Sequence, residues 1–255
     1  GIDHASHQPL GVDAETFHPA RGVRDLRREL GLEPGSRLLL YAGRFSQEKR
    51  IDVLRAALRR LGPAYQLVLL GGAQSRQLER NVRTLPYRRD PAELASWMAS
   101  ADALVHAGTE ETFGLVVLEA MACGRPVVAT RAGALPELVS DQTGLLARPG
   151  DPADLADAIE GLYDLDREAM GRAARERVLR QFTWTEVFTH QLERYATLVR
   201  RRAGASPATT TAAAGSAAQA SFTSSNTVSR PLRSPTATWR PSGDQRRHEG
   251  SESVR

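Results

Sequence analysis

The chain has 255 residues, of which 41% are hydrophobic and 25% charged, with a formal net charge of +4 and one cysteine. A single cysteine excludes an intrachain disulfide framework, and no stretch of 18 consecutive apolar residues is present to span a membrane. The basic residues form no dense block of the kind found in nucleic-acid-binding arms, apart from the short run at 200–202, so we expect no nucleic-acid partner.

Strands and helices are predicted to alternate along the first two hundred residues. The predicted strands cover residues 37–41, 66–70, 82–85, 103–106, 126–130 and 144–147. The predicted helices cover residues 51–61, 90–99, 115–123, 135–140, 152–165, 167–181 and 185–201. This alternation predicts an α/β fold in which a Rossmann-like parallel sheet is doubly wound, with helices on both faces.

The composition changes at residue 203. Residues 203–255 are dominated by Ser, Thr, Ala, Pro and Arg and have no sustained apolar period. Such a segment cannot bury enough apolar surface to fold, so we predict a disordered, low-complexity tail. A frameshifted gene end has the same appearance, and this alternative stays open.

The loop after the first predicted strand combines a glycine with two cations. Gly43 permits a sharp turn, and Arg44 and Lys49 follow it at the carboxyl end of a strand, where open α/β sheets bind ligands. Lys49 is the only lysine in the chain, although Lys and Arg together number 34, which suggests a site that needs a compact ammonium group. Two such cations would neutralise a diphosphate; the alternative is a solvated loop that happens to carry a lysine.

The segment 108–130 holds two glutamates eight residues apart, Glu111 and Glu119. The predicted helix 115–123 is apolar except at Glu119, and a carboxylate buried there is costly unless it is hydrogen-bonded. Glu111 precedes the helix, beside residues whose backbone N–H groups would face an anion: Thr112, Phe113 and Gly114. The combination suits a ligand that carries both hydroxyls and phosphate, such as a nucleotide sugar.

Each glutamate also has a structural interpretation. Glu111 is compatible with a first-turn acid favoured by the helix dipole, and Glu119 with a partner of a structural arginine. Their spacing, together with the Phe-Gly step and the GRPVVAT exit at 124–130, favours the binding interpretation.

Three motifs together resemble the retaining glycosyltransferases of family 4, which have the GT-B fold: Gly43-Arg44-Phe45…Glu48-Lys49, Glu111-x7-Glu119 and PLGVDAETFHP at 9–19. The resemblance covers residue 9 to about residue 201. It implies a carboxy-terminal donor-binding domain at 23–202, preceded at 1–22 by the remnant of an interdomain linker. It also implies that an amino-terminal acceptor domain is missing.

The resemblance implies a role for each motif residue. Arg44 and Lys49 would stabilise the departing diphosphate, Glu111 would contact the sugar hydroxyls, and Glu119 would accept hydrogen bonds from the ribose hydroxyls. We therefore expect three catalytic residues, Arg44, Lys49 and Glu111. The expected donor-binding residues are Gly43, Tyr87, Arg88, Thr112, Phe113, Gly114, Leu115 and Glu119, with backbone at 87–88 contacting the nucleotide base.

The implied reaction moves a hexose with retention, without a metal or cofactor, to a glycan or lipid-linked acceptor. The donor would be a nucleoside-diphosphate sugar such as GDP-mannose or UDP-glucose; mannose is favoured on family likeness only. A cytoplasmic location is expected, with peripheral contact to the inner membrane face as an alternative. The main alternative function is a non-catalytic nucleotide-sugar-binding module or an inactive fragment.

Two other enzyme classes fit less well. A nicotinamide oxidoreductase needs G-x-G-x-x-G after its first strand, where this chain has AGRFSQ at 42–47. A pyridoxal-dependent phosphorylase needs a lysine in an apolar pocket, whereas Lys49 lies on a polar loop beside Arg44.

Four further features have weaker interpretations. Gly71-Gly72 fits a tight turn as well as a donor contact, His106 fits a hydrogen-bonded packing residue better than a site residue, and Glu137 fits a helix-start acid. From the resemblance, the last helix braces the missing domain, which would leave apolar side chains exposed on it: Phe188, Leu192 and Tyr195.

Overall fold

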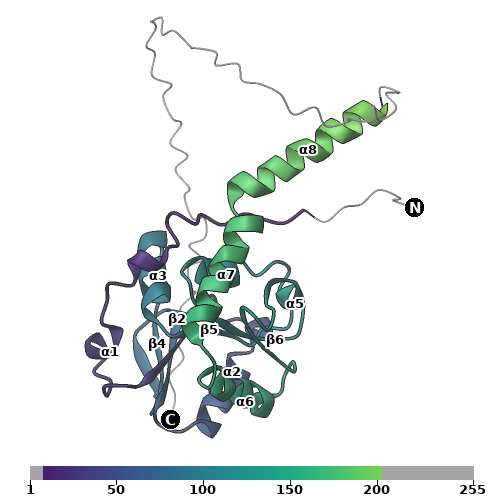
Figure 1. The fold of residues 1–255 in the computed structure, drawn as a ribbon. Coiled ribbons are helices and arrows are strands. Elements are labelled where there is room, and N and C mark those ends of the chain that lie inside the picture. Colours follow the sequence, from purple (N-terminus) through teal and green to yellow (C-terminus); the bar gives the residue numbers. More distant parts are fainter. Residues whose placement is uncertain (1–7, 203–255) are drawn as a thin grey trace, which may run out of the picture. The chain divides into compact units, whose positions relative to one another are not determined.

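The computed structural model describes residues 8–202, which form one seven-stranded sheet with helices on both faces (Figure 1). The strands are β1 (Arg37–Ala42), β2 (Tyr65–Gly72), β3 (Arg76–Glu79), β4 (Val82–Pro86), β5 (Ala103–His106), β6 (Val127–Thr130) and β7 (Gly144–Ala147). The α-helices are α1 (Leu26–Glu29), α2 (Ile51–Arg60), α3 (Pro91–Ser100), α4 (Leu115–Ala122), α5 (Leu135–Leu138), α6 (Pro152–Leu162), α7 (Arg167–Gln181) and α8 (Trp184–Arg202). Two 3₁₀ turns, η1 (Pro19–Arg21) and η2 (Gln47–Lys49), complete the elements.

The strand order β3-β4-β2-β1-β5-β6-β7 places the switch of direction between β1 and β5. From β1 the chain moves outward through β2 and β4, and then returns to β5 on the other side of β1. Connections therefore diverge at the carboxyl ends of these two central strands, which opens a crevice there. The loop at 43–50 leaves β1 and the loop at 107–114 leaves β5, so both loops carrying the predicted site residues border this crevice.

The doubly wound, Rossmann-like sheet predicted from the alternating pattern is confirmed. In β1, alternate side chains enter two separate cores: Leu38 and Leu40 pack with α3, α4, α5 and α7, whereas Leu39 and Tyr41 pack with α2 and α6. All four side chains are at most 1% exposed. Burial on both faces is typical of a parallel strand and explains why residues 37–41 are apolar without alternation.

The antiparallel edge strand β3 is not among the sequence predictions. It pairs with β4 and has the sequence RQLE, which lacks the apolar pattern that identifies a strand. The short helix α1 is also missing from the predictions, and α5 and α6 end earlier than expected, at Leu138 and Leu162 instead of residues 140 and 165. Ends of helices are the least reliable part of a sequence-based assignment.

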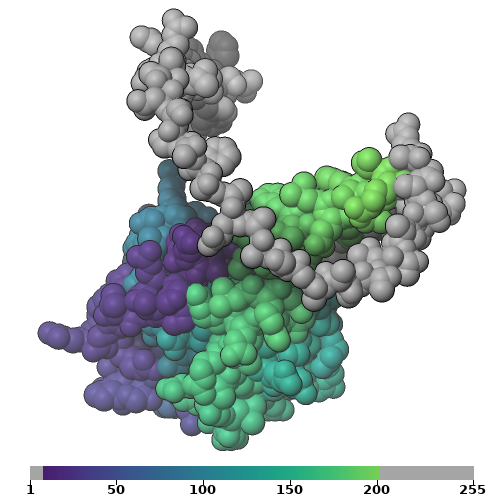
Figure 2. All heavy atoms as spheres, turned by 45° about the horizontal axis from the view of Figure 1, so that its top comes forward, coloured from purple at the N-terminus to yellow at the C-terminus, as the bar shows by residue number. Residues whose placement is uncertain are grey.

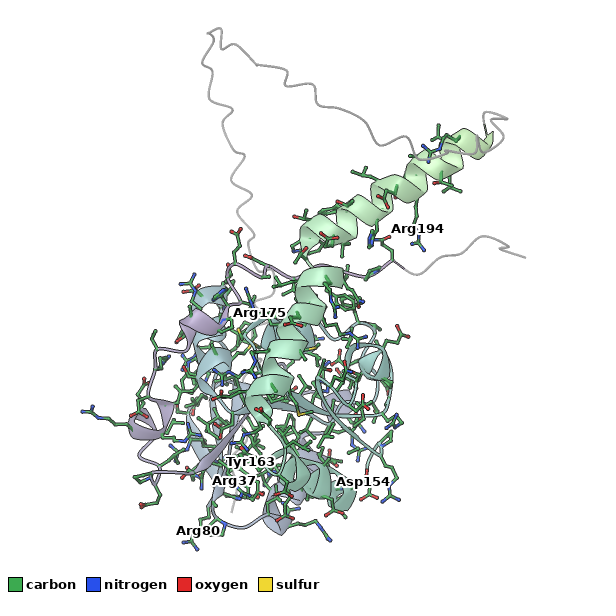
Figure 3. All side chains as sticks on the ribbon, in the orientation of Figure 1. Arg37, Arg80, Asp154, Tyr163, Arg175 and Arg194 are labelled. Atoms are coloured by element: carbon green, nitrogen blue, oxygen red, sulfur yellow. The ribbon has the colours of Figure 1, made fainter. Side chains whose placement is uncertain are left out.

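The amino ends of the central strands are closed by aromatic and charged side chains. The guanidinium of Arg37 lies 4.6 Å from the ring centroids of both Tyr65 and Tyr163, and Figure 3 shows Arg37 and Tyr163 side by side. The hydroxyl of Tyr163 donates to Asp102, which also accepts two hydrogen bonds from Arg27. This end of the sheet is thus occupied by its own side chains, whereas the carboxyl end is open.

The segment before the first strand packs against the carboxy-terminal helices, as Figure 2 shows for its purple atoms beside the green ones. Val12 bridges Thr183, and the Gln8 side chain donates to the Val187 carbonyl. Val12 and Phe17 are buried, so part of the segment interpreted as a linker remnant joins the core. The predicted disordered tail at 203–255 lies outside the described residues.

The last helix, α8, exposes the apolar side chains expected of it. Phe188, Leu192 and Tyr195 are 52%, 66% and 54% exposed. Within residues 8–202, no helix combines the length and the apolar character needed to cross a bilayer.

Candidate functional site

A cleft of about 720 Å³ opens at the carboxyl ends of β1 and β5, at the switch point of the sheet. Nine of the eleven predicted site residues line it: Gly43, Arg44, Lys49, Tyr87, Glu111, Thr112, Phe113, Gly114 and Leu115. Residues that the sequence predictions left out of the site also line it: Leu10, Tyr41, Ala42, Gly71, His106 and Val116. The fold therefore brings together the glycine loop and the first glutamate, which are about sixty residues apart in the sequence.

At the floor of the cleft, the backbone turns at Gly43 and Gly71 approach each other closely. The Gly43 amide donates to the Leu70 carbonyl over 2.9 Å, and a Cβ on Gly71 (φ 145°) would collide with the Gly43 carbonyl oxygen. The buried Tyr41 hydroxyl donates to the Arg44 carbonyl over 2.8 Å and fixes the next turn. The tight turn at Gly71 is confirmed, and the residue also lines the cleft; its contact with a donor stays a prediction.

Glu111 lies at the centre of the polar contacts in the cleft. Its Oε1 accepts hydrogen bonds from the Lys49 ammonium and from Nε2 of His106, the latter over 3.0 Å. The Lys49 and Glu111 side chains are only 18% and 12% exposed. Lys49 thus belongs to a specific, largely buried ion pair, and the alternative of a solvated loop lysine is wrong.

The backbone of Glu111 is held as firmly as its side chain. The Ala134 amide donates to the Glu111 carbonyl over 2.9 Å, and a Cβ on Gly133 (φ 54°) would collide with that same carbonyl oxygen. The turn at 133–134 is therefore a support for Glu111 that sequence reasoning missed; its glycine was the available signal. Glu137 does not line the cleft and lies in the first turn of α5, as predicted.

Hydrogen bonds from His106 and Lys49 lower the pKa of Glu111 to about 2, although burial opposes the change. The carboxylate is consequently ionised throughout the physiological range. A carboxylate with so low a pKa is a weak proton acceptor, but because it stays ionised the hydrogen bonds that it accepts are charge-assisted.

We expect the stability of the protein in acid to depend on Glu111. Its pKa rises from about 2 in the folded state to the ordinary value of 4.5 on unfolding, so its stabilising contribution is complete above pH 4.5 and is lost as the pH falls towards 2. The loss between pH 7 and pH 3 should be about 2 kcal/mol. Denaturant unfolding of wild type and Glu111→Gln at both pH values measures it: the wild type should lose more stability than the variant, and equal losses would contradict the assignment.

Open backbone amides line the cleft at the start of α4. The N–H groups of Thr112, Phe113 and Gly114 donate no hydrogen bond within residues 8–202, and Gly114 adopts φ 81° as the N-cap of α4. The free amides and the positive end of the helix dipole both favour an anion at this point.

Glu119 does not itself line the cleft; it lies one turn further along α4, on the same helix face as Leu115, which does. Burial raises the pKa of Glu119 to about 7. Its carboxylate has no hydrogen bond or ion pair within the described part of the chain, so the alternative of a structural arginine partner is wrong. A half-buried acid without a protein partner is expected where a ligand supplies the hydrogen bonds.

The three remaining predicted site residues lie at the rim of the cleft or outside it. Arg44 is exposed at the rim of the cleft, and no ion pair within residues 8–202 involves its guanidinium. The Tyr87 side chain is 59% exposed and lines the cleft. Arg88 does not line the cleft, and its Nε lies 3.3 Å from Oε1 of Glu93.

The sheet, the cleft at its switch point and the ion pair of Lys49 with Glu111 in that cleft define a Rossmann-like domain of the type found as the carboxy-terminal half of GT-B glycosyltransferases. The sequence model of the family described as "Glycosyl transferases group 1" matches residues 36–164. The chain belongs to this family.

Two curated relatives and one solved structure illustrate the likeness. The chain is 39% identical to D-inositol 3-phosphate glycosyltransferase from Pseudarthrobacter chlorophenolicus, over 79% of the chain and 52% of the relative. It is 38% identical to the GDP-mannose-dependent alpha-(1-6)-phosphatidylinositol dimannoside mannosyltransferase of Mycobacterium tuberculosis, over 69% of the chain and 48% of that protein. Anabaena HepE, solved in complex with UDP and glucose, superposes with a TM-score of 0.62 and 28% identity, over 74% of the chain and 55% of HepE. The chain thus spans about half the length of the curated relatives that it matches.

Proposed function

We propose that this domain binds a nucleoside-diphosphate sugar and is the donor half of a retaining, metal-independent glycosyltransferase of family 4. The observation that carries the proposal is the arrangement around Glu111: an ionised acid, two cations and a row of open amides meet in one cleft. These groups match the sugar hydroxyls, the diphosphate and the developing charge of such a donor. The mannosyltransferase relative is named as GDP-mannose-dependent, and HepE was solved with UDP and glucose. Both observations support a nucleoside-diphosphate sugar as the ligand.

Each group has a defined role in the proposed reaction. Arg44, Lys49 and the amides at 112–114 stabilise the diphosphate as the bond between the anomeric carbon and the phosphate oxygen breaks. The acceptor hydroxyl forms the new bond on the same face of the sugar, and its proton passes to the departing phosphate oxygen. Glu111 binds sugar hydroxyls and does not act as the base, because its low pKa makes it a poor proton acceptor.

The ribose is assigned to Glu119. Its carboxylate has no hydrogen bond or ion pair within residues 8–202, and Glu119 lies one turn beyond Leu115, a residue that lines the cleft, on the same face of α4. Two vicinal hydroxyls would supply the hydrogen bonds that this buried acid lacks. Tyr87, which lines the cleft, borders the place left for the base.

The transferred sugar is proposed to be a hexose, with mannose as the preferred candidate and glucose as the alternative. The mannosyltransferase relative favours mannose, and HepE with UDP and glucose keeps glucose as the alternative. Calorimetric titration of the purified chain with GDP-mannose and UDP-glucose tests the proposal directly. Binding of neither nucleotide sugar would overturn it, and binding without transfer in the presence of an acceptor domain would favour a non-catalytic binding module.

The two cations are expected to recognise phosphate charge. Arg44→Ala and Lys49→Ala should each weaken binding of the nucleoside diphosphate by about tenfold or more and leave binding of the bare nucleoside nearly unchanged. Arg180→Ala, on the exposed surface of α7, is the matched control and should change neither affinity. Equal weakening of both ligands would show that the cations act only on the structure of the cleft.

Lys49→Arg is the sharper probe of the same site. The Lys49 ammonium lies largely buried between the η2 turn and Glu111, where a longer and planar guanidinium does not have the same geometry. We expect this variant to bind the nucleoside diphosphate at least severalfold more weakly than wild type. A fully competent Lys49→Arg protein would show that the single lysine of the chain has no special role.

A further inference from the structure

His106 is the last residue of β5, and the proposed reaction gives it no role. Its side chain is only 1% exposed and lies under the cleft, with its ring centroid 5.9 Å from that of Tyr41. The sequence favours a hydrogen-bonded packing residue at this position. The structure places both of its nitrogens in specific hydrogen bonds, one of them to Glu111.

The two hydrogen bonds determine which nitrogen carries the proton. The Gly108 amide donates to Nδ1 of His106 over 3.1 Å, and a backbone N–H can donate only to an unprotonated ring nitrogen. Nε2, 3.0 Å from Oε1 of Glu111, then carries the hydrogen and donates it to the carboxylate. His106 is thus assigned as the neutral Nε2–H tautomer. Gly108 permits this contact, because a Cβ there would lie 2.5 Å from Cε1 of His106.

The two oxygens of the Glu111 carboxylate consequently differ in their hydrogen bonding. Oε1 accepts both protein hydrogen bonds, whereas Oε2 accepts none from residues 8–202. Lys49 alone would leave the carboxylate free to rotate about its last bond, since an ammonium on a flexible stem is a point charge without directional demand. The rigid imidazole, anchored at its other nitrogen, removes that freedom and leaves Oε2 available to a ligand.

We propose that His106 is a positioning residue for recognition of the donor sugar. By fixing the rotation of Glu111, it presents Oε2 to a hydroxyl of the sugar, and it does so without contact to the nucleotide. This inference rests on the proposed function, because it requires a nucleoside-diphosphate sugar in the cleft. It predicts that His106 contributes to the affinity for the sugar part of the donor and not to the affinity for the nucleoside diphosphate.

Two substitutions separate the two hydrogen bonds of His106. His106→Gln keeps an amide N–H near the position of Nε2 and can still donate to Glu111. His106→Asn is shorter and retains only an acceptor near the position of Nδ1, for the Gly108 amide. The dissociation constants of each variant are measured for the nucleotide sugar that binds the wild type and for its parent nucleoside diphosphate, with thermal melting as the control for folding.

We expect His106→Asn to bind the nucleotide sugar about tenfold more weakly, with less than a twofold change for the nucleoside diphosphate. His106→Gln should recover most of the loss. Equal weakening of both ligands, or no rescue by glutamine, would overturn the inference and leave the proposed function intact. Failure of the wild type to bind either ligand would overturn both.

A spectroscopic measurement tests the tautomer without any ligand. In ¹⁵N-histidine-labelled protein near pH 7, the His106 ring should show a protonated Nε2 and an unprotonated, hydrogen-bonded Nδ1. The Nε2 proton signal should shift in Glu111→Gln, because its acceptor changes from a carboxylate to an amide oxygen. A ring protonated at Nδ1, in either the neutral or the charged form, would overturn the assignment.

Discussion

Replacing Glu119 by glutamine is expected to weaken nucleotide binding by about 5- to 150-fold, the range for losing charge-assisted hydrogen bonds of 1–3 kcal/mol. The same change should stabilise the ligand-free protein at pH 8. Burial raises the pKa of Glu119 to about 7, so the folded protein holds this proton more tightly than the unfolded chain, where the pKa is near 4.5. Stability therefore falls as the pH rises from about 4.5 to 7, by up to about 3 kcal/mol.

Glutamine removes this cost, so Glu119→Gln should raise the free energy of unfolding by about 1–3 kcal/mol at pH 8 and have little effect at pH 4. Denaturant unfolding at the two pH values measures the gain, and calorimetry with the nucleotide sugar measures the affinity. Glu160→Gln, on the exposed side of α6, is a matched control. Loss of stability with unchanged affinity would instead make Glu119 a structural residue.

The affinity of the wild type should itself depend on pH. Glu119 accepts hydrogen bonds from ribose best when it is ionised, so binding of the nucleotide sugar should strengthen as the pH rises through about 7. A nucleotide sugar is the appropriate probe, because its diphosphate is esterified at both ends and does not titrate in this range, unlike a terminal phosphate. Glu119→Gln should abolish the dependence.

Sugar transfer by this chain alone is expected to be at least a thousandfold slower than transfer by the same domain joined to an acceptor domain. An acceptor must be held over the anomeric carbon in a closed, water-poor cleft, and such positioning contributes factors of this size or more. Residues 8–202 form an open cleft at the carboxyl ends of β1 and β5, which we expect to be one wall of the closed site. The chain spans about half the length of its curated relatives, and the prediction takes the second wall from their other half.

Fusing the amino-terminal half of a curated relative ahead of residue 9, or adding it as a separate chain, should restore transfer from a radiolabelled nucleotide sugar. Lys49→Ala in the fusion should abolish the restored sugar transfer, and this loss would show that the activity uses the cleft described above. We also expect the isolated chain to self-associate through the apolar side chains exposed on α8, and docking of that half to reduce the self-association by covering them: Phe188, Leu192 and Tyr195. Full turnover by the 255-residue chain without any addition would contradict this prediction.

Much of the fold could be predicted because its signals are local. The apolar run at 37–41 and the alternation of strands with helices of about ten residues identify the doubly wound sheet without knowledge of any contact. β3 could not be predicted in this way, because a polar edge strand acquires its conformation from hydrogen bonds to β4 and not from its own pattern.

The candidate site, too, could be predicted only in part from the sequence. The residue types of the site and their spacing could be predicted from the sequence: a lone lysine after a glycine turn, and two glutamates eight residues apart around a helix start. The contacts that these residues make could not be predicted. No sequence pattern indicated that Lys49 and His106 share one oxygen of Glu111, or that the Glu119 carboxylate has no partner among residues 8–202.

The class of fold, the groups available for chemistry and the end of the sheet at which they lie could thus be predicted from local patterns, because strand and helix periods and glycine turns act over a few residues. Which of these groups touch depends on how distant segments pack. Lys49 meets Glu111 because β5 returns to lie beside β1 after the chain has passed through β2 and β4, and the turn at 133–134 reaches Glu111 from beyond β6. Such contacts join residues that are distant in the chain, and they form because the helices that cover the two faces of the sheet build a separate core on each face.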